Sequence, residues 1–175
     1  NNCFSFIGHS RLVTNGIQSE VNNNQPTYVD GQIGVHNGII ANENKLWNIH
    51  TDLSKEYEVD TELFLKLLNK NYLLNSDIHE SVSQTYKEIE GSASIATFFK
   101  AVPRLLLATN TGSLFYITNQ SESVFIFASE RFILKQLITL RQFQGLFSSS
   151  KINQLQANNY ININLKKLDF SKCEF

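Results

Sequence analysis

The sequence predicts an α+β domain in which helices cover a largely antiparallel sheet. Three observations support this: the chain opens with strand patterns, continues with amphipathic helices, and then shows short apolar runs separated by turn residues. Such a segregated order of strands and helices is typical of the α+β class. With 175 residues, of which 42% are hydrophobic, the chain is long enough to bury one sizeable core. We therefore expect residues 1–175 to form a single domain.

The first third of the chain combines two short strands with polar loops. Alternating apolar residues predict a strand over 3–7, and a second apolar run predicts a strand over 32–36. Residues 8–16 are expected to form a polar loop. Residues 39–49 are expected to be partly helical.

Two helices should follow. Asp60 is expected to be the N-cap of the first, because a carboxylate at that position can accept from the free backbone N–H groups of the first turn. Behind it lies an apolar stripe at helical spacing, formed by Leu63, Phe64, Leu67 and Leu68. A second helix is expected over 78–89, with Asp77 near its start.

The rest of the chain has the pattern of antiparallel hairpins, in which short apolar runs alternate with turn residues. The strands expected there are 93–99, 105–108, 114–118, 124–128 and 159–165. A short helix is expected over 129–140.

The composition argues against several classes of partner. With 15 basic and 16 acidic residues, the chain has no electrostatic footprint for nucleic acid or an anionic membrane. No apolar run approaches the roughly eighteen residues of a membrane span. The two cysteines make no disulfide framework, which favours a cytoplasmic setting. The four histidines lack metal-ligand spacing and no glycine-rich phosphate loop occurs, so we expect no metal and no cofactor.

The sequence contains no methionine, not even at position 1. On this ground we expect the chain to be part of a longer protein.

The pair Asn37-Gly38 follows the second predicted strand and has two interpretations. Asn-Gly after a strand is the strongest short pattern for a tight hairpin turn. Alternatively, the Asn amide and the Gly N–H both donate to a developing oxyanion, where each donor lowers the barrier by roughly 3 kcal/mol. Spacing alone favours the turn.

Other polar residues could bind a small zwitterion, and each also has a purely structural interpretation. Arg11 is suited to a bidentate grip on a carboxylate, or to an ordinary salt bridge. Thr14 could add a hydroxyl or could bond its own turn. Asn15 belongs to the same loop. Asp60 could accept from a substrate ammonium, in competition with its role as a helix cap.

Taken together, these segments resemble the class II glutamine amidotransferases, the glutaminases whose nucleophile is an amino-terminal cysteine. The likeness is greatest to isomerising glucosamine-6-phosphate synthase and its relatives. The matching motifs appear in the family's order: GHSRxxTxGxxSExN at 8–22, VHNGIIxN at 35–42, DTE at 60–62, EGSASIA at 90–96 and FASER at 127–131. Three or more motifs in the correct order are far more specific than any one of them.

This resemblance implies a role for each candidate residue. Arg11, with Thr14 and the neighbouring Asn15, would hold the glutamine α-carboxylate, and Asp60 would receive the α-ammonium. Asn37 and Gly38 would form the oxyanion hole. The implied fold is a four-layer αββα sandwich of the N-terminal-nucleophile hydrolase type. The implied partners are glutamine and a downstream synthase or sugar-isomerase domain or subunit. A homodimer is a further expectation.

The sequence departs from the family pattern in two places. Close relatives carry His where this chain has Asn15. The family's cysteine nucleophile precedes the arginine-bearing motif, here at 8–22, by several dozen residues, whereas Cys3 lies within the first predicted strand. We therefore expect an N-terminally incomplete domain that does not hydrolyse glutamine by itself. The alternative is a module that has lost catalysis and only binds glutamine or serves a structural role.

Overall fold

The computed structural model describes residues 4–10, 23–99, 102–167 and 169–175. The elements in these ranges are β1 (Thr27–Val29), β2 (Gln32–Ile40), α1 (Glu43–Ile49), α2 (Asp60–Asn75), α3 (Ile78–Glu88), β3 (Gly91–Phe99), β4 (Arg104–Thr109), β5 (Leu114–Thr118), β6 (Phe125–Ala128), α4 (Arg131–Thr139), β7 (Asn153–Leu155), β8 (Asn159–Asn164) and β9 (Asp169–Glu174). No helix among them is long and apolar enough to cross a membrane.

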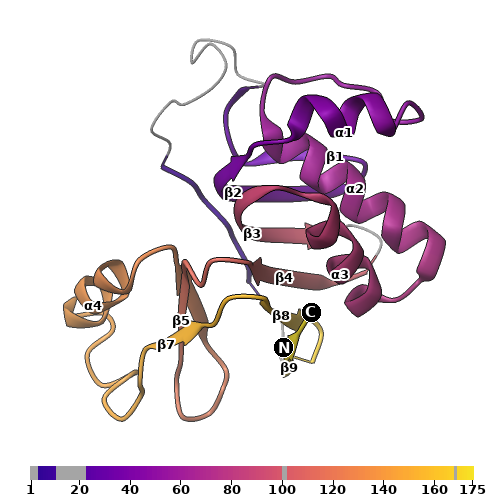
Figure 1. Cartoon of the computed structure of the whole chain (residues 1–175). Helices are drawn as coiled ribbons and strands as arrows, with labels where there is room; N and C mark the ends of the chain where they lie inside the picture. Colours follow the sequence, from indigo (N-terminus) through magenta and orange to yellow (C-terminus); the bar gives the residue numbers. More distant parts are fainter. Residues whose placement is uncertain (1–3, 11–22, 100–101, 168) are drawn as a thin grey trace.

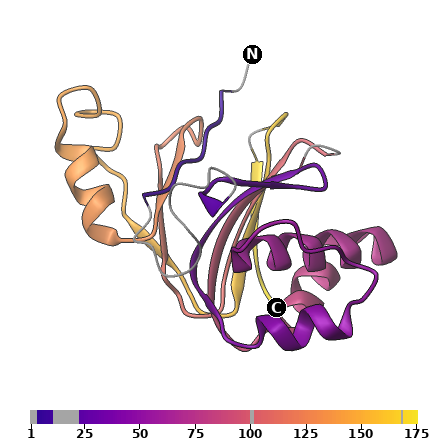
Figure 2. The same ribbon diagram turned by 90° about the horizontal axis from the view of Figure 1, so that it is seen from above.

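The strands form two antiparallel sheets. One has the order β1-β2-β3-β4-β8-β9 and the other the order β6-β5-β7. Helices α1, α2 and α3 lie on one face of the larger sheet, as Figure 1 shows. The smaller sheet lies on the opposite face, and α4 is on its outer side (Figure 2). The predicted α+β class with antiparallel sheets is confirmed.

Separate apolar clusters hold these layers together. The predicted stripe of α2 is fully buried against the larger sheet, where Leu63 and Phe64 share a cluster with Ile95. Val35 and Ile161 belong to the cluster between the two sheets. A third cluster fixes α4 to the smaller sheet. Because each fully buried large side chain contributes about 1.5–3 kcal/mol, these clusters are the main source of stability.

The helix starts confirm one prediction and correct another. Asp77 is the N-cap of α3, and its side chain accepts from the N–H of Glu80 at 2.8 Å. Asp60, however, is not an N-cap. It is the first residue of α2, the capping position is Val59, and the Asp60 carboxylate is turned toward β2 instead.

Several strand predictions also need correction. Residues 4–7 form no strand. β2 does not end at residue 36 but continues to Ile40, so Asn37 and Gly38 lie within the strand and the hairpin-turn interpretation is wrong. The cause is β3, which pairs with β2 along its whole length and keeps the chain extended. Residues 109–112 likewise make no hairpin, since β4 pairs within the larger sheet and β5 within the smaller one. The short strands β1, β7 and β9 were not predicted.

A buried ion pair fixes the loop that leads into α2. The Glu62 carboxylate is fully buried and accepts from the N–H groups of Glu56 and Tyr57, each at 2.8 Å. Lys66, also buried, lies 3.3 Å from Glu62 and 3.0 Å from Glu56. Burial acts to lower the pKa of Lys66, but the Glu56 hydrogen bond and the Glu62 charge outweigh it, so the pKa is raised. The segment just before Asp60 is therefore firmly held.

We predict that Glu62→Ala destabilises the fold by about 3–5 kcal/mol, because it leaves a buried ammonium without one of its two carboxylate partners and two backbone N–H groups without an acceptor. Urea unfolding measures the loss. Glu90→Ala, which removes an exposed partner of Lys45, is the matched control and should change stability by about 0.5 kcal/mol or less. Equal losses in the two variants would contradict the prediction.

Candidate functional site

The candidate site lies along the edge of β2, beyond the point where β1 stops pairing with it. Thr27 is the first residue of β1 and lies opposite Gly34. Past that pair, the Gln25 side chain continues the pairing. Its Nε2 donates to the His36 carbonyl at 3.0 Å, and its Oε1 accepts from the His36 N–H at 2.6 Å.

Asp60 occupies the same edge a few residues further on. Its Oδ2 accepts from the N–H of Ile40 at 2.9 Å, and its Oδ1 lies 3.2 Å from Nδ1 of His36. Gln25 and Asp60 therefore flank the peptide of Gly38 on the edge of β2.

The pKa of Asp60 is lowered in the folded protein. Burial acts to raise it, because it disfavours the charged form. The hydrogen bond and charge of His36 outweigh this, together with hydrogen bonds from the N–H groups of Ile40 and Thr61. The carboxylate is thus held ionised where a cationic group could meet it.

Only glycine fits at position 38. Its φ is +150°, and a Cβ added there would lie 2.0 Å from the carbonyl oxygen of Ser92 and 2.8 Å from Nε2 of His36. The Ser92 carbonyl also lies 3.2 Å from that same Nε2. Meanwhile the Ile39 N–H donates to the Ser92 hydroxyl at 3.3 Å. The close approach of this backbone leaves no room for a side chain at position 38.

Asn37 belongs to the opposite face of the sheet from His36, because successive residues of a strand alternate. It is exposed and lies opposite Ser94 in the β2–β3 register. Ser94 in turn lies opposite Thr109, and their hydroxyl oxygens are 2.7 Å apart. Both are buried, so Asn37 is next to an ordered hydroxyl network.

The structure thus brings Asp60 and Gly38 to one strand edge and places Asn37 beside them on the other face. Arg11, Thr14 and Asn15 lie outside the described residues. The described residue that follows their loop, Asn23, is buried and exchanges two hydrogen bonds with Glu58, at 2.7 and 3.1 Å.

The sequence interpretation missed two contributors to this site, Gln25 and His36. His36 was considered only as one of four histidines without metal-ligand spacing, and Gln25 was given no role. The VHNG motif did include His36, but its contact with a carboxylate twenty-four residues away is visible only in the fold.

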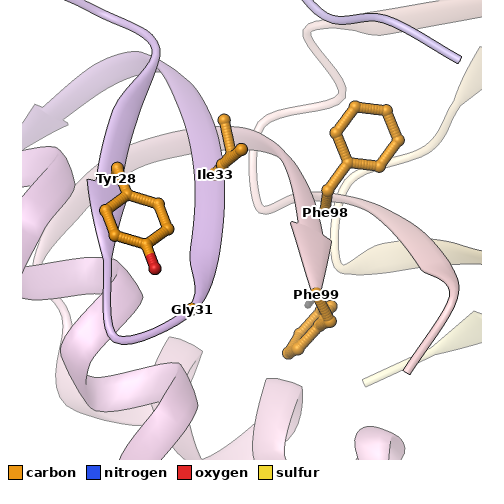
Figure 3. Close-up of a pocket in the computed structure, with 5 residues that line it drawn as sticks. All are labelled: Tyr28, Gly31, Ile33, Phe98 and Phe99. Atoms are coloured by element: carbon orange, nitrogen blue, oxygen red, sulfur yellow. The ribbon is translucent and has the colours of Figure 1, made fainter. Parts of the chain in front are cut away.

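The described residues offer no group of three or more His, Cys, Asp or Glu side chains that could hold a metal ion. A hollow of about 220 Å³ lies at the other end of β2, as Figure 3 shows. It is lined by Tyr28, Gly31, Ile33, Phe98 and Phe99. Its mainly apolar lining lacks the charges that a zwitterion needs, so it is not the candidate site.

The two antiparallel sheets, with helices on their outer sides, define an α+β domain. A family model described as "Glutamine amidotransferase domain" matches residues 9–136. The chain therefore belongs to this family and is a class II glutamine amidotransferase domain.

Two curated relatives have the same name, glutamine–fructose-6-phosphate aminotransferase (isomerizing). The protein from Chlamydia pneumoniae is 29% identical over 170 residues, which are 94% of this chain and 27% of the relative. The protein from Caldanaerobacter subterraneus is 36% identical over 105 residues, 58% of this chain and 17% of the relative. The chain thus spans about a quarter or less of the length of these relatives.

Solved structures share the fold. Glutamine phosphoribosylpyrophosphate amidotransferase from B. subtilis superimposes with a TM-score of 0.69 at 14% identity, covering 95% of this chain and 34% of that one. A structure described as the allosteric regulatory enzyme of purine biosynthesis gives a TM-score of 0.64 at 13% identity, covering 87% of this chain and 31% of that one.

We predict that Gly38→Ala destabilises the protein by about 2 kcal/mol or more, because an L residue is strained at this φ and its Cβ would overlap the Ser92 carbonyl. Urea unfolding is the measurement. Gly8→Ala is the matched control, since nothing lies within 4 Å of an added Cβ there; it should change stability by about 0.5 kcal/mol or less. If Gly38→Ala left the free energy of unfolding unchanged, the close packing around position 38 would be absent.

We also predict that Asp60 contributes to acid sensitivity. Because its pKa is lower in the folded than in the unfolded state, the ionised form stabilises the fold above the unfolded pKa of about 4. This contribution is lost as the pH falls through the folded pKa. Asp60→Asn should therefore be less stable than the parent at about pH 6, and the difference should narrow on acidification. A difference that stays constant over the whole pH range would contradict this.

Proposed function

We propose that this chain is the glutaminase domain of a glutamine-dependent amidotransferase. It would hydrolyse the side-chain amide of glutamine and release ammonia to a sugar phosphate held by a synthase or sugar-isomerase domain or subunit. Membership of the glutamine amidotransferase family supports the first part. The names of the curated relatives support the sugar-phosphate acceptor.

One observation carries the proposal: the peptide of Gly38 is left between two occupied positions on the edge of β2. The N–H groups of His36 and Ile40 point away from β3, to Gln25 and Asp60. In an antiparallel strand these directions alternate, so the N–H of Gly38 faces the same side. We infer that it is available to a substrate oxygen.

This arrangement suits the roles proposed for the oxyanion hole and the ammonium site. The Gly38 N–H and the Asn37 amide would donate to the oxyanion that forms when the amide carbon is attacked. Asp60 would accept from the substrate α-ammonium. Its two oxygens offer about four lone pairs, and the contacts with His36, Ile40 and Thr61 use three of them.

The α-carboxylate of glutamine would be bound by Arg11, with Thr14 and Asn15 nearby. The support is indirect. The chain that follows this loop is anchored at Asn23 to Glu58, two residues before Asp60. This anchor brings the chain that follows the arginine-bearing segment close to Asp60 in space.

The nucleophile in this proposal is the amino-terminal cysteine expected from the family resemblance. Its thiolate would attack the amide carbon, ammonia would leave, and water would hydrolyse the resulting thioester to glutamate. Cys3 lies outside the described residues. Cys173 lies in β9, at the opposite edge of the larger sheet from β1, and is given no role.

The remaining features of the proposal concern the whole protein. The order of layers, with helices, larger sheet, smaller sheet and α4, supports a four-layer αββα sandwich. We propose that residues 1–175 are part of one such domain, that the protein is cytoplasmic, and that it is a homodimer.

We predict that Asp60→Asn weakens glutamine binding by roughly ten- to a hundredfold, because hydrogen bonds to charged groups contribute about 1.5–3 kcal/mol. Calorimetry on protein expressed from the complete coding sequence measures this. Asp77→Asn is the matched control, because its carboxylate caps α3 and Asn is an equally good cap.

The outcomes separate the two functional hypotheses. Glutamine hydrolysis together with an affinity loss confined to Asp60→Asn supports the glutaminase. Binding without any ammonia release supports a module that has lost catalysis. Unchanged affinity in Asp60→Asn would falsify the site assignment.

A further inference from the structure

The imidazole of His36 is buried at the meeting point of three elements. Its Nδ1 lies 3.2 Å from Oδ1 of Asp60 on α2, and its Nε2 lies 3.2 Å from the carbonyl of Ser92 on β3. Both neighbours are oxygen acceptors. The side chain is only 1% exposed, so a substrate cannot reach the ring.

The backbone of His36 is held as firmly as its ring. Gln25 pairs with both its N–H and its carbonyl, in the position that a neighbouring strand would otherwise take. The ring therefore has little freedom to move, so it can fix the positions of the Asp60 carboxylate and the Ser92 carbonyl.

Its two contacts lead to the proposed glutamine site, one directly at Asp60 and one through Ser92 to Gly38. Through Nδ1 it fixes the Asp60 carboxylate, which would otherwise be held by backbone N–H groups alone. Through Nε2 it keeps the Ser92 carbonyl against Gly38, in the space that a Cβ would need.

We propose that His36 is a positioning residue with two separable tasks. One ring nitrogen aims the Asp60 carboxylate at the substrate ammonium, and the other keeps the Gly38 peptide turned toward the oxyanion. The inference rests on the proposed function. It adds to that function a residue that contacts no substrate and acts only through Asp60 and Gly38.

Two substitutions separate the tasks. Asn carries an N–H donor at the same bond separation from Cβ as Nδ1 does, so His36→Asn keeps the contact with Asp60 and loses the one with Ser92. Gln carries its donor at the separation of Nε2, so His36→Gln does the reverse.

Steady-state glutaminase kinetics on the intact protein provide the test. His36→Gln should raise KM for glutamine roughly tenfold, with kcat within about threefold of the parent, as expected for a weakened charged contact. His36→Asn should leave KM within about threefold and lower kcat roughly tenfold or more, because the oxyanion donor is misplaced. Equal effects of the two variants on KM and kcat would overturn the proposal.

His50 provides the matched control. It is another largely buried histidine, whose Nε2 lies 2.6 Å from Glu88 and whose Nδ1 lies 3.0 Å from Lys70. It belongs to the helical layer, at the C-terminal cap of α1. His50→Asn and His50→Gln should change stability but should not separate KM from kcat. A separation of the same kind there would count against a specific role for His36.

Hydrogen exchange at the Ile40 amide tests the inference without glutamine. This N–H donates to Asp60, so its exchange reports whether the carboxylate stays in place. We expect roughly tenfold faster exchange in His36→Gln than in His36→Asn. If the intact protein neither binds nor hydrolyses glutamine, the proposed function fails while this measurement still judges His36. Equal exchange in the two variants would refute its positioning role.

Discussion

The contact between the Asp60 carboxylate and the edge of β2 is the interaction on which the site depends. A strand edge must have its backbone N–H and carbonyl groups paired or hydrated. Here β1 begins only at Thr27, opposite Gly34, and beyond that pair side chains take its place along β2: Gln25 at His36 and Asp60 at Ile40. One side-chain amide and one carboxylate thus serve as substitutes for a strand. The gap that they leave is the proposed position of the substrate.

The position of Asp60 depends on two sets of contacts: those of its carboxylate with β2, and those that fix the start of α2. Two carboxylates of the first turn of α2 have opposite directions and different tasks. Asp60 reaches β2, whereas Glu62 binds the backbone of the preceding loop and pairs with Lys66. The buried pair is therefore structural, and it fixes the N-terminal end of α2, which carries Asp60. The same DTE motif thus holds a binding residue and the anchor that supports it.

The parts of the fold that follow from local patterns were predicted well. The apolar stripe of α2 and the Asp77 cap of α3 need only residues close in sequence. Spacing alone favoured a turn at Asn37-Gly38, yet pairing with β3 keeps the strand extended through both residues. Asp60 was expected to cap its own helix, but its carboxylate accepts from the Ile40 N–H on β2 instead. The contact between His36 and Ser92 joins residues fifty-six positions apart, and no local pattern indicates it.

By itself, the sequence determined the α+β class, the helices and most of the longer strands, because hydrophobic period and turn chemistry act over a few residues. Its ordered motifs also determined the family resemblance. Only the tertiary structure decided that Gly38 lies inside a strand, that Asp60 is bonded to that strand's edge, and that His36 links them. These facts depend on where β3 and α2 meet β2, and that is set by the packing of apolar surfaces distant in sequence.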